Sequence, residues 1–173
     1  MSVWQQEEGK ELPSGIDEKV LLPPERGTAQ RRGTMRTINE IIIHCTGTVP
    51  SEKTTVESIR EYHVNHNGWK DIGYHYLIYL DGSIHQGRPI DVQGAHCENH
   101  NRNTIGICYV GGLDSNKKPK DTRTVAQVAA LRQLVKSLKT VFPTIKKVSG
   151  HYQYSSKPCP CFDVQKFVND FGL

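Results

Sequence analysis

The sequence predicts an α/β fold, a single domain in which helices pack on a mixed central β-sheet. Three observations lead to this class: a β-branched run at residues 41–43, two alternating segments around a tight turn at residues 74–86, and an amphipathic stripe at residues 125–142. Strands mixed with helices along one chain favour a sheet covered by helices. We expect this domain to span residues 37–173, and the proline- and glycine-rich residues 1–36 to form an irregular or docked N-terminal extension.

The first half of the domain is predicted to hold a strand, a helix and a hairpin. Ile41-Ile42-Ile43-His44-Cys45 is a short apolar run that indicates a buried strand. Thr54 and Glu57 match a capping box, so a helix should begin there. In residues 74–86, two alternating runs flank Asp81-Gly82, the strongest short signal for a hairpin turn.

The second half is predicted to hold a strand, the longest helix, an edge strand and a final helix. Residues 104–110 form another strand-like run, whereas Thr124 and Gln127 make a second capping box. The helix that follows has a core-facing stripe made of Val125, Val128, Leu131, Val135, Leu138 and Phe142. Residues 146–149 suit a short edge strand, and Asp163 suits the N-cap of the last helix.

The composition and the charge pattern argue against several classes of protein. Hydrophobic residues make up 36% and charged residues 23% of the chain, with a net charge of +4, which suits a globular domain rather than a disordered or membrane chain. No stripe of lysine and arginine is interleaved with aromatic residues, so we expect no nucleic-acid partner. The first residues lack the basic start and apolar stretch of a signal peptide, and five cysteines, an odd number, favour reduced thiols.

The densest group of reactive side chains lies in residues 150–163, which contain His151, Lys157 and Cys159. Prolines on both sides of Cys159 predict a stiff, near-extended segment, in which Lys157 and Cys159 would point into one space. A cation beside a thiol favours the thiolate, the form that binds metal or attacks carbon. This segment is therefore the first candidate for a reactive site.

Zinc is the most economical explanation of these residues. A catalytic zinc site takes three protein ligands and leaves a fourth position for water. His151 and Cys159 would supply two ligands, and His44, at the end of a buried apolar strand, is the natural third. The alternative reading of His44, which spacing leaves open, is a hydrogen-bonded structural histidine.

Other histidines and cysteines are expected to have structural places. His63 and His66 should lie on a solvated helix face, and Cys45 and Cys108 should lie in the core. Cys161, two residues after Cys159, is expected to be a semi-buried bystander rather than a ligand.

Six motifs follow one another in the order Ile42-Ile43-His44-Cys45-Thr46, Gly68-Trp69-x-Asp71-Ile72-Gly73-Tyr74-His75-Tyr76, Asp81-Gly82-x-Ile84, Gly94-Ala95-His96, Asn103-Thr104-Ile105-Gly106, and His151 through Lys157-x-Cys159-Pro160. Together they closely resemble the zinc-dependent N-acetylmuramoyl-L-alanine amidases of the phage-lysozyme and peptidoglycan-recognition-protein superfamily. The resemblance covers roughly residues 37–170, and it implies the mixed sheet and helices of that fold.

The resemblance also implies an activity: hydrolysis of the amide between the lactyl group of N-acetylmuramic acid and the L-alanine of the stem peptide. Residues at the family's functional positions are His44, His151 and Cys159 as ligands of Zn²⁺, Tyr74 and Lys157 as catalytic residues, and His96 as a substrate contact. A structural role for His96 is the equally open alternative. Lys157 would stabilise the oxyanion, and Tyr74 would hydrogen-bond the reacting water or the departing amine.

The resemblance implies that this protein is a phage endolysin or a bacterial cell-wall amidase. Such a protein would be made in the cytoplasm without a signal peptide, act on peptidoglycan after release, and work as a monomer with no membrane partner. The alternative is a peptidoglycan-binding or RNA-polymerase-regulating relative with little or no hydrolysis. The complete ligand set argues against a purely binding role, and it leaves open an added contact with phage or host RNA polymerase. Hydrolysis of a different muramyl or peptide amide is a third reading.

Overall fold

The computed structural model describes residues 16–21 and 35–173. Within these residues, five strands form one mixed sheet in the order β3-β2-β4-β1-β5. The strands are β1 Glu40–Cys45, β2 Tyr76–Ile78, β3 Ile84–Gln86, β4 Thr104–Tyr109 and β5 Lys147–Gly150. β1 runs parallel to β4 and β5, and β2 runs parallel to β4, whereas β2 and β3 form the predicted antiparallel hairpin. The predicted α/β class and mixed sheet are therefore confirmed.

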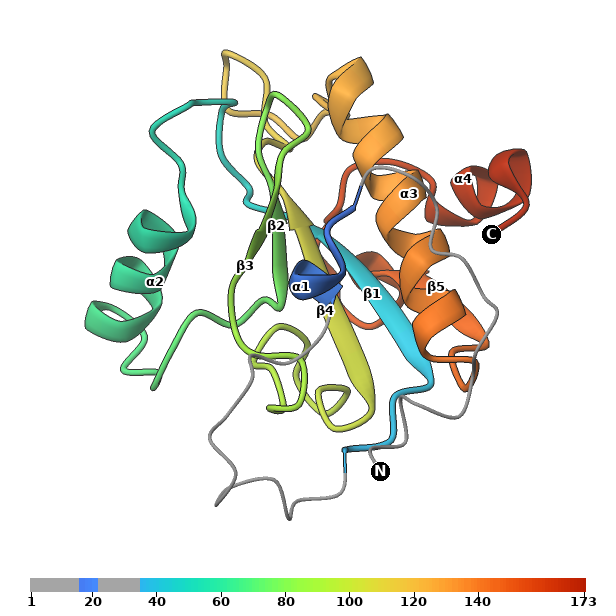
Figure 1. Cartoon of the computed structure of the whole chain (residues 1–173). Helices are drawn as coiled ribbons and strands as arrows, with labels where there is room; N and C mark the ends of the chain where they lie inside the picture. The colour runs from blue at the N-terminus through green and yellow to red at the C-terminus, as the bar shows by residue number, and fades with distance from the viewer. Residues whose placement is uncertain (1–15, 22–34) are drawn as a thin grey trace.

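Helices cover both faces of this sheet. They are α1 Glu18–Leu21, α2 Val56–Asn65, α3 Val125–Val141 and α4 Val164–Phe171, with a 3₁₀ helix at His151–Gln153. Figure 1 shows α2 on one side of the strands and α3 and α4 on the other. None of the helices in residues 16–21 and 35–173 is long and apolar enough to cross a membrane.

Strand alternation divides the core into two parts. Ile41 and Ile43 of β1 pack in one cluster with side chains of α3 and α4, including Leu131 and Phe167. His44 points to the other face, because successive side chains alternate along a strand. On β4, Cys108 pairs with His44 and belongs to the cluster beneath α2. His44 is thus buried on the α2 face, at the carboxyl end of β1.

Two predicted helix details are wrong. Helix α2 is capped by Thr55 rather than Thr54, because the Thr55 hydroxyl accepts the Ser58 N–H at 3.1 Å and the Ser58 hydroxyl accepts the Thr55 N–H at 2.8 Å. Val125, predicted to face the core, is 89% exposed at the first position of α3. The remaining members of its stripe pack against the main core, and the predicted Thr124 capping box is present.

The described part of the N-terminal extension is docked on the domain. Helix α1 packs against α3 and β3, and Leu21 is fully buried in the main core. The Tyr76 hydroxyl donates a hydrogen bond to the Leu21 carbonyl at 3.4 Å. Residues 1–15 and 22–34 of the predicted extension lie outside the described residues, so the boundary at residue 36 stays a prediction.

Replacing Leu21 with alanine should measurably destabilise the domain. Deleting a fully buried leucine side chain costs about 2–5 kcal/mol of unfolding free energy, and Leu21 is 0% exposed. Urea denaturation of Leu21→Ala beside Lys19→Ala, an exposed residue of the same helix, measures this effect. Equal free energies of unfolding for the two variants would show that burial of the Leu21 side chain contributes nothing to stability.

Candidate metal centre

His44, His151 and Cys159 lie together at the carboxyl edge of the sheet. Each offers a ligand atom, and these atoms all lie within 4.8 Å of one another. The Cys159 Sγ is 3.9 Å from the His44 Nδ1. Parallel pairing explains the meeting of the two histidines: β5 lies beside β1, and each histidine stands where its strand ends. The structure thus brings together the three residues that the sequence singled out as ligands.

A turn brings Cys159 to this edge. The Tyr152 N–H donates to the Cys159 carbonyl at 2.8 Å, and the Cys161 N–H donates to the Pro158 carbonyl at 2.7 Å. The chain therefore folds back at Cys159, and the predicted near-extended conformation is wrong. The two prolines are compatible with this turn, because a fixed φ is as typical of turns as of extended segments.

The Cys159 sulfur lies close to the end of β1. The Cys45 N–H donates to the Cys159 Sγ at 3.3 Å. Cys161 lies apart from the three candidate ligands, and its Sγ is 3.9 Å from the Cys45 Sγ. Only one of the neighbouring thiols is therefore aimed at the two histidines.

Both histidines are held in the form that binds metal. Burial lowers the pKa of His44 well below its usual value. The pKa of His151 is lowered by burial and, to a smaller extent, by the charge of Lys157. Each ring therefore keeps a lone pair at neutral pH, as a metal ligand requires.

This donor set fits Zn²⁺. Two imidazole nitrogens and one thiolate sulfur are typical catalytic zinc ligands. A nitrogen and a sulfur on one tetrahedral zinc lie about 3.5 Å apart at bond lengths of about 2.0–2.3 Å, and His44 Nδ1 and Cys159 Sγ are separated by 3.9 Å. A small closing movement of the side chains would complete the site.

Tyr74 and Lys157 lie beside this group in different surroundings. The Tyr74 ring is partly buried, with its centroid 5.2 Å from that of His44. Burial raises the pKa of Tyr74 well above its usual value, so its hydroxyl keeps the proton. Lys157 is exposed, and its charge acts on His151. One neutral hydrogen-bond donor and one exposed cation therefore flank the site.

His96, for which a substrate contact and a structural role are both open from the sequence, packs behind His44. His96 is only 8% exposed, and its Nδ1 lies 2.8 Å from the His44 Nε2. Its Nε2 is 3.2 Å from the Thr104 hydroxyl. Because both ring nitrogens have protein partners, a substrate contact would have to displace one of them.

His63 is buried, contrary to the sequence-based prediction. It was expected on a solvated helix face, but it is 8% exposed, and its Nδ1 accepts the Gly73 N–H at 3.0 Å. Its ring lies 4.6 Å from that of Trp69 and 5.6 Å from that of Tyr74. The spacing of Val56, Ile59 and His63 is that of a buried helix stripe, and this signal could have located it.

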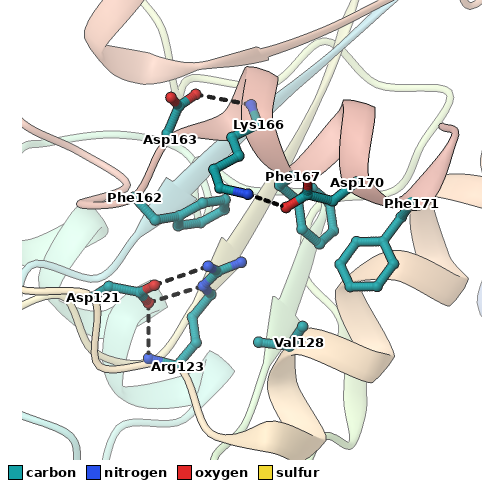
Figure 2. Close-up of a pocket in the computed structure, with 9 residues that line it drawn as sticks. All are labelled: Asp121, Arg123, Val128, Phe162, Asp163, Lys166, Phe167, Asp170 and Phe171. Atoms are coloured by element: carbon teal, nitrogen blue, oxygen red, sulfur yellow. Dashed lines mark hydrogen bonds and ion pairs between the residues drawn. The ribbon is translucent and has the colours of Figure 1, made fainter.

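The recess drawn in Figure 2 is separate from the candidate metal centre. It lies between the segment before α3 and helix α4, and its lining residues are Asp121, Arg123, Val128, Phe162, Asp163, Lys166, Phe167, Asp170 and Phe171. The Arg123 guanidinium lies 3.3 Å over the Phe162 ring and pairs with Asp121 at 2.9 Å. None of the three candidate ligands lines this recess.

Comparison with known proteins finds similarity over most of the chain. The sequence profile of the N-acetylmuramoyl-L-alanine amidase family matches residues 34–162. The endolysin of Klebsiella phage KP32 is 36% identical over 129 residues, which cover 75% of this chain and 84% of that protein. The endolysin of Escherichia phage T7 is 36% identical over 127 residues, 73% of this chain and 83% of that protein. The solved structure of the N-acetylmuramoyl-L-alanine amidase LysC from Clostridium intestinale URNW has a TM-score of 0.68 and 26% identity, covering 80% of this chain and 87% of that chain.

Proposed function

This chain belongs to the N-acetylmuramoyl-L-alanine amidase family, and we propose that it cleaves peptidoglycan with a Zn²⁺ ion held by His44, His151 and Cys159. As an amidase of this family, it is a peptidoglycan hydrolase acting between N-acetylmuramic acid and the L-alanine of the stem peptide. The observation that supports the zinc site is the convergence of two neutral imidazoles and one thiol at one edge of the sheet.

The residues around the site divide the catalytic work. Zinc, when bound, would supply a Lewis acid that lowers the pKa of water toward neutrality. Lys157 brings a positive charge to the carbonyl oxygen of the lactyl group as that oxygen becomes negative. Tyr74 keeps its proton, so it acts as a hydrogen-bond donor that orients the reacting groups. His44 and His151 remain neutral and hold the metal.

The proposed place of action is the bacterial cell wall. The relatives at 36% identity are phage endolysins, and we infer that this chain likewise acts on the wall after release from the cell that makes it. The binding-only reading is less well supported, because the thiol and both imidazoles of the candidate site are present together.

The bond cleaved can be identified from the products. Digestion of purified peptidoglycan should release stem peptides that begin with a free L-alanine amine and leave lactyl carboxylates on the glycan, without new reducing sugar ends. Mass spectrometry of the soluble fragments measures both. Binding to the wall without fragments would favour the recognition-only alternative, and new reducing ends would show a glycosidase instead.

Removal of the metal should abolish activity reversibly. Treatment with a chelator such as 1,10-phenanthroline, followed by dialysis, should reduce wall hydrolysis to background, because the Lewis acid contributes several kcal/mol to the reaction barrier. Addition of one equivalent of Zn²⁺ should restore it, whereas Mg²⁺ should not, because Mg²⁺ prefers oxygen ligands. Full activity in the metal-free protein would contradict the proposed mechanism.

A further inference from the structure

A chain of hydrogen bonds runs from β4 to the candidate metal centre. The His96 ring lies between Thr104, the first residue of β4, and His44. Its Nε2 is 3.2 Å from the Thr104 Oγ1 and its Nδ1 is 2.8 Å from the His44 Nε2. The remaining ring nitrogen of His44, Nδ1, is the atom that faces Cys159. His96 therefore touches a candidate ligand without being one.

The donor and acceptor of each of these hydrogen bonds follow from counting the available protons. The Thr104 hydroxyl donates its single proton to the His100 carbonyl at 2.6 Å, because a carbonyl can only accept. Thr104 can then only accept from His96, so the His96 proton is on Nε2. A neutral imidazole with its proton on Nε2 has an acceptor at Nδ1. His44 must therefore donate from its own Nε2.

From this order we infer that His96 is a positioning residue: it holds His44 in the tautomer whose Nδ1 lone pair is aimed at the metal. The inference rests on the proposed zinc site and extends it to two residues that do not bind the ion, His96 and Thr104. An uncharged His96 suits this place, since it is buried and neither of its two hydrogen-bond partners is a carboxylate. Metal-bound histidines commonly need such a partner to fix their tautomer and ring orientation.

The backbone around His96 is shaped to hold its ring. The N–H groups of His96 and Cys97 both donate to the Asn101 Oδ1, at 2.8 and 3.0 Å. A Cβ at Gly106 would lie 2.5 Å from the His96 Cγ, and a Cβ at Gly94 would lie 2.7 Å from the His96 Cδ2. Any larger residue at these two positions would push the ring out of place. On β4, Gly106 pairs with Ile42 of β1, two residues before His44, so the ring rests on the sheet beside the ligand.

The metal-free protein provides the first test. With ¹⁵N-labelled imidazoles, NMR should show His44 carrying its proton on Nε2 and His96 carrying its proton on Nε2. This measurement needs neither zinc nor activity, so it decides the inference even if the wild-type protein bound no zinc and the proposed function failed. A His44 proton on Nδ1 would overturn the inference.

Paired variants provide the second test, with zinc affinity measured by competition with a chromophoric chelator. His96→Leu removes the acceptor and should weaken zinc binding by about 10- to 100-fold. His96→Asn can place a carbonyl oxygen near the former Nδ1 and should retain most of the affinity. Thr104→Val should weaken binding in the same direction, whereas Thr104→Ser, which keeps the hydroxyl, should not. Wild-type zinc affinity in both His96→Leu and Thr104→Val would overturn the inference, and a melting curve of each metal-free variant checks folding.

Discussion

Cys159→Ser should yield a folded protein that holds no zinc and has no measurable amidase activity. Serine keeps the size of the side chain but loses the thiolate, and a neutral hydroxyl is a poor zinc ligand. Loss of a Lewis acid that contributes about 4 kcal/mol or more corresponds to at least about a 1,000-fold loss of rate. Zinc content by inductively coupled plasma mass spectrometry, together with hydrolysis of purified peptidoglycan, measures the two effects separately.

Cys161→Ser is the matched control for this substitution. Cys161 is another partly buried cysteine, two residues further along the chain, and it does not belong to the group of candidate ligands. This variant should keep one zinc per chain and its activity. Retention of zinc by Cys159→Ser, or its loss from Cys161→Ser, would reassign the sulfur ligand.

Lys157→Ala should separate metal binding from catalysis. Lys157 does not belong to the group of candidate ligands and is exposed, so its removal should leave the zinc content unchanged. Its charge is expected to act on the oxyanion, and loss of one such group typically costs about 100- to 1,000-fold in kcat. Steady-state kinetics on soluble muropeptides should therefore show a fall in kcat with little change in KM.

Lys136→Ala is the control for the loss of one positive charge. Lys136 is exposed on α3, which covers the opposite face of the sheet from His44. Its removal should change neither kcat nor zinc content. An equal kcat for Lys157→Ala and the wild-type protein would show that the oxyanion is stabilised by another group.

Much of the fold could be predicted because its signals are local. The β-branched run before His44, the hairpin around Asp81-Gly82 and the capping box at Thr124 each depend on a few neighbouring residues. The capping box at α2 was misplaced by one residue. Thr54 and Thr55 are both good N-caps, and the choice between them depends on tertiary contacts such as the hydrogen bond from the Val56 N–H to the Tyr79 hydroxyl at 2.9 Å.

The surroundings of the candidate site could not be predicted in the same way, because they depend on contacts between distant segments. His96 reaches His44 across 52 positions of sequence, and no local pattern records that meeting. The turn at Cys159 was predicted as an extended segment, since proline is compatible with both conformations. His63 lies against Gly73 and Trp69; the helical spacing of Val56, Ile59 and His63 indicates a buried face, but it does not show which distant residues cover that face.

The central claim is that two imidazoles and one thiolate hold a single zinc ion in this protein. X-ray absorption at the zinc edge of the purified protein tests it most directly, since it counts the sulfur and imidazole neighbours of the metal. We expect one sulfur at about 2.3 Å and two imidazole nitrogens at about 2.0–2.1 Å, with a further light atom completing the shell. A shell without sulfur, or a protein that takes up no zinc, would contradict the claim.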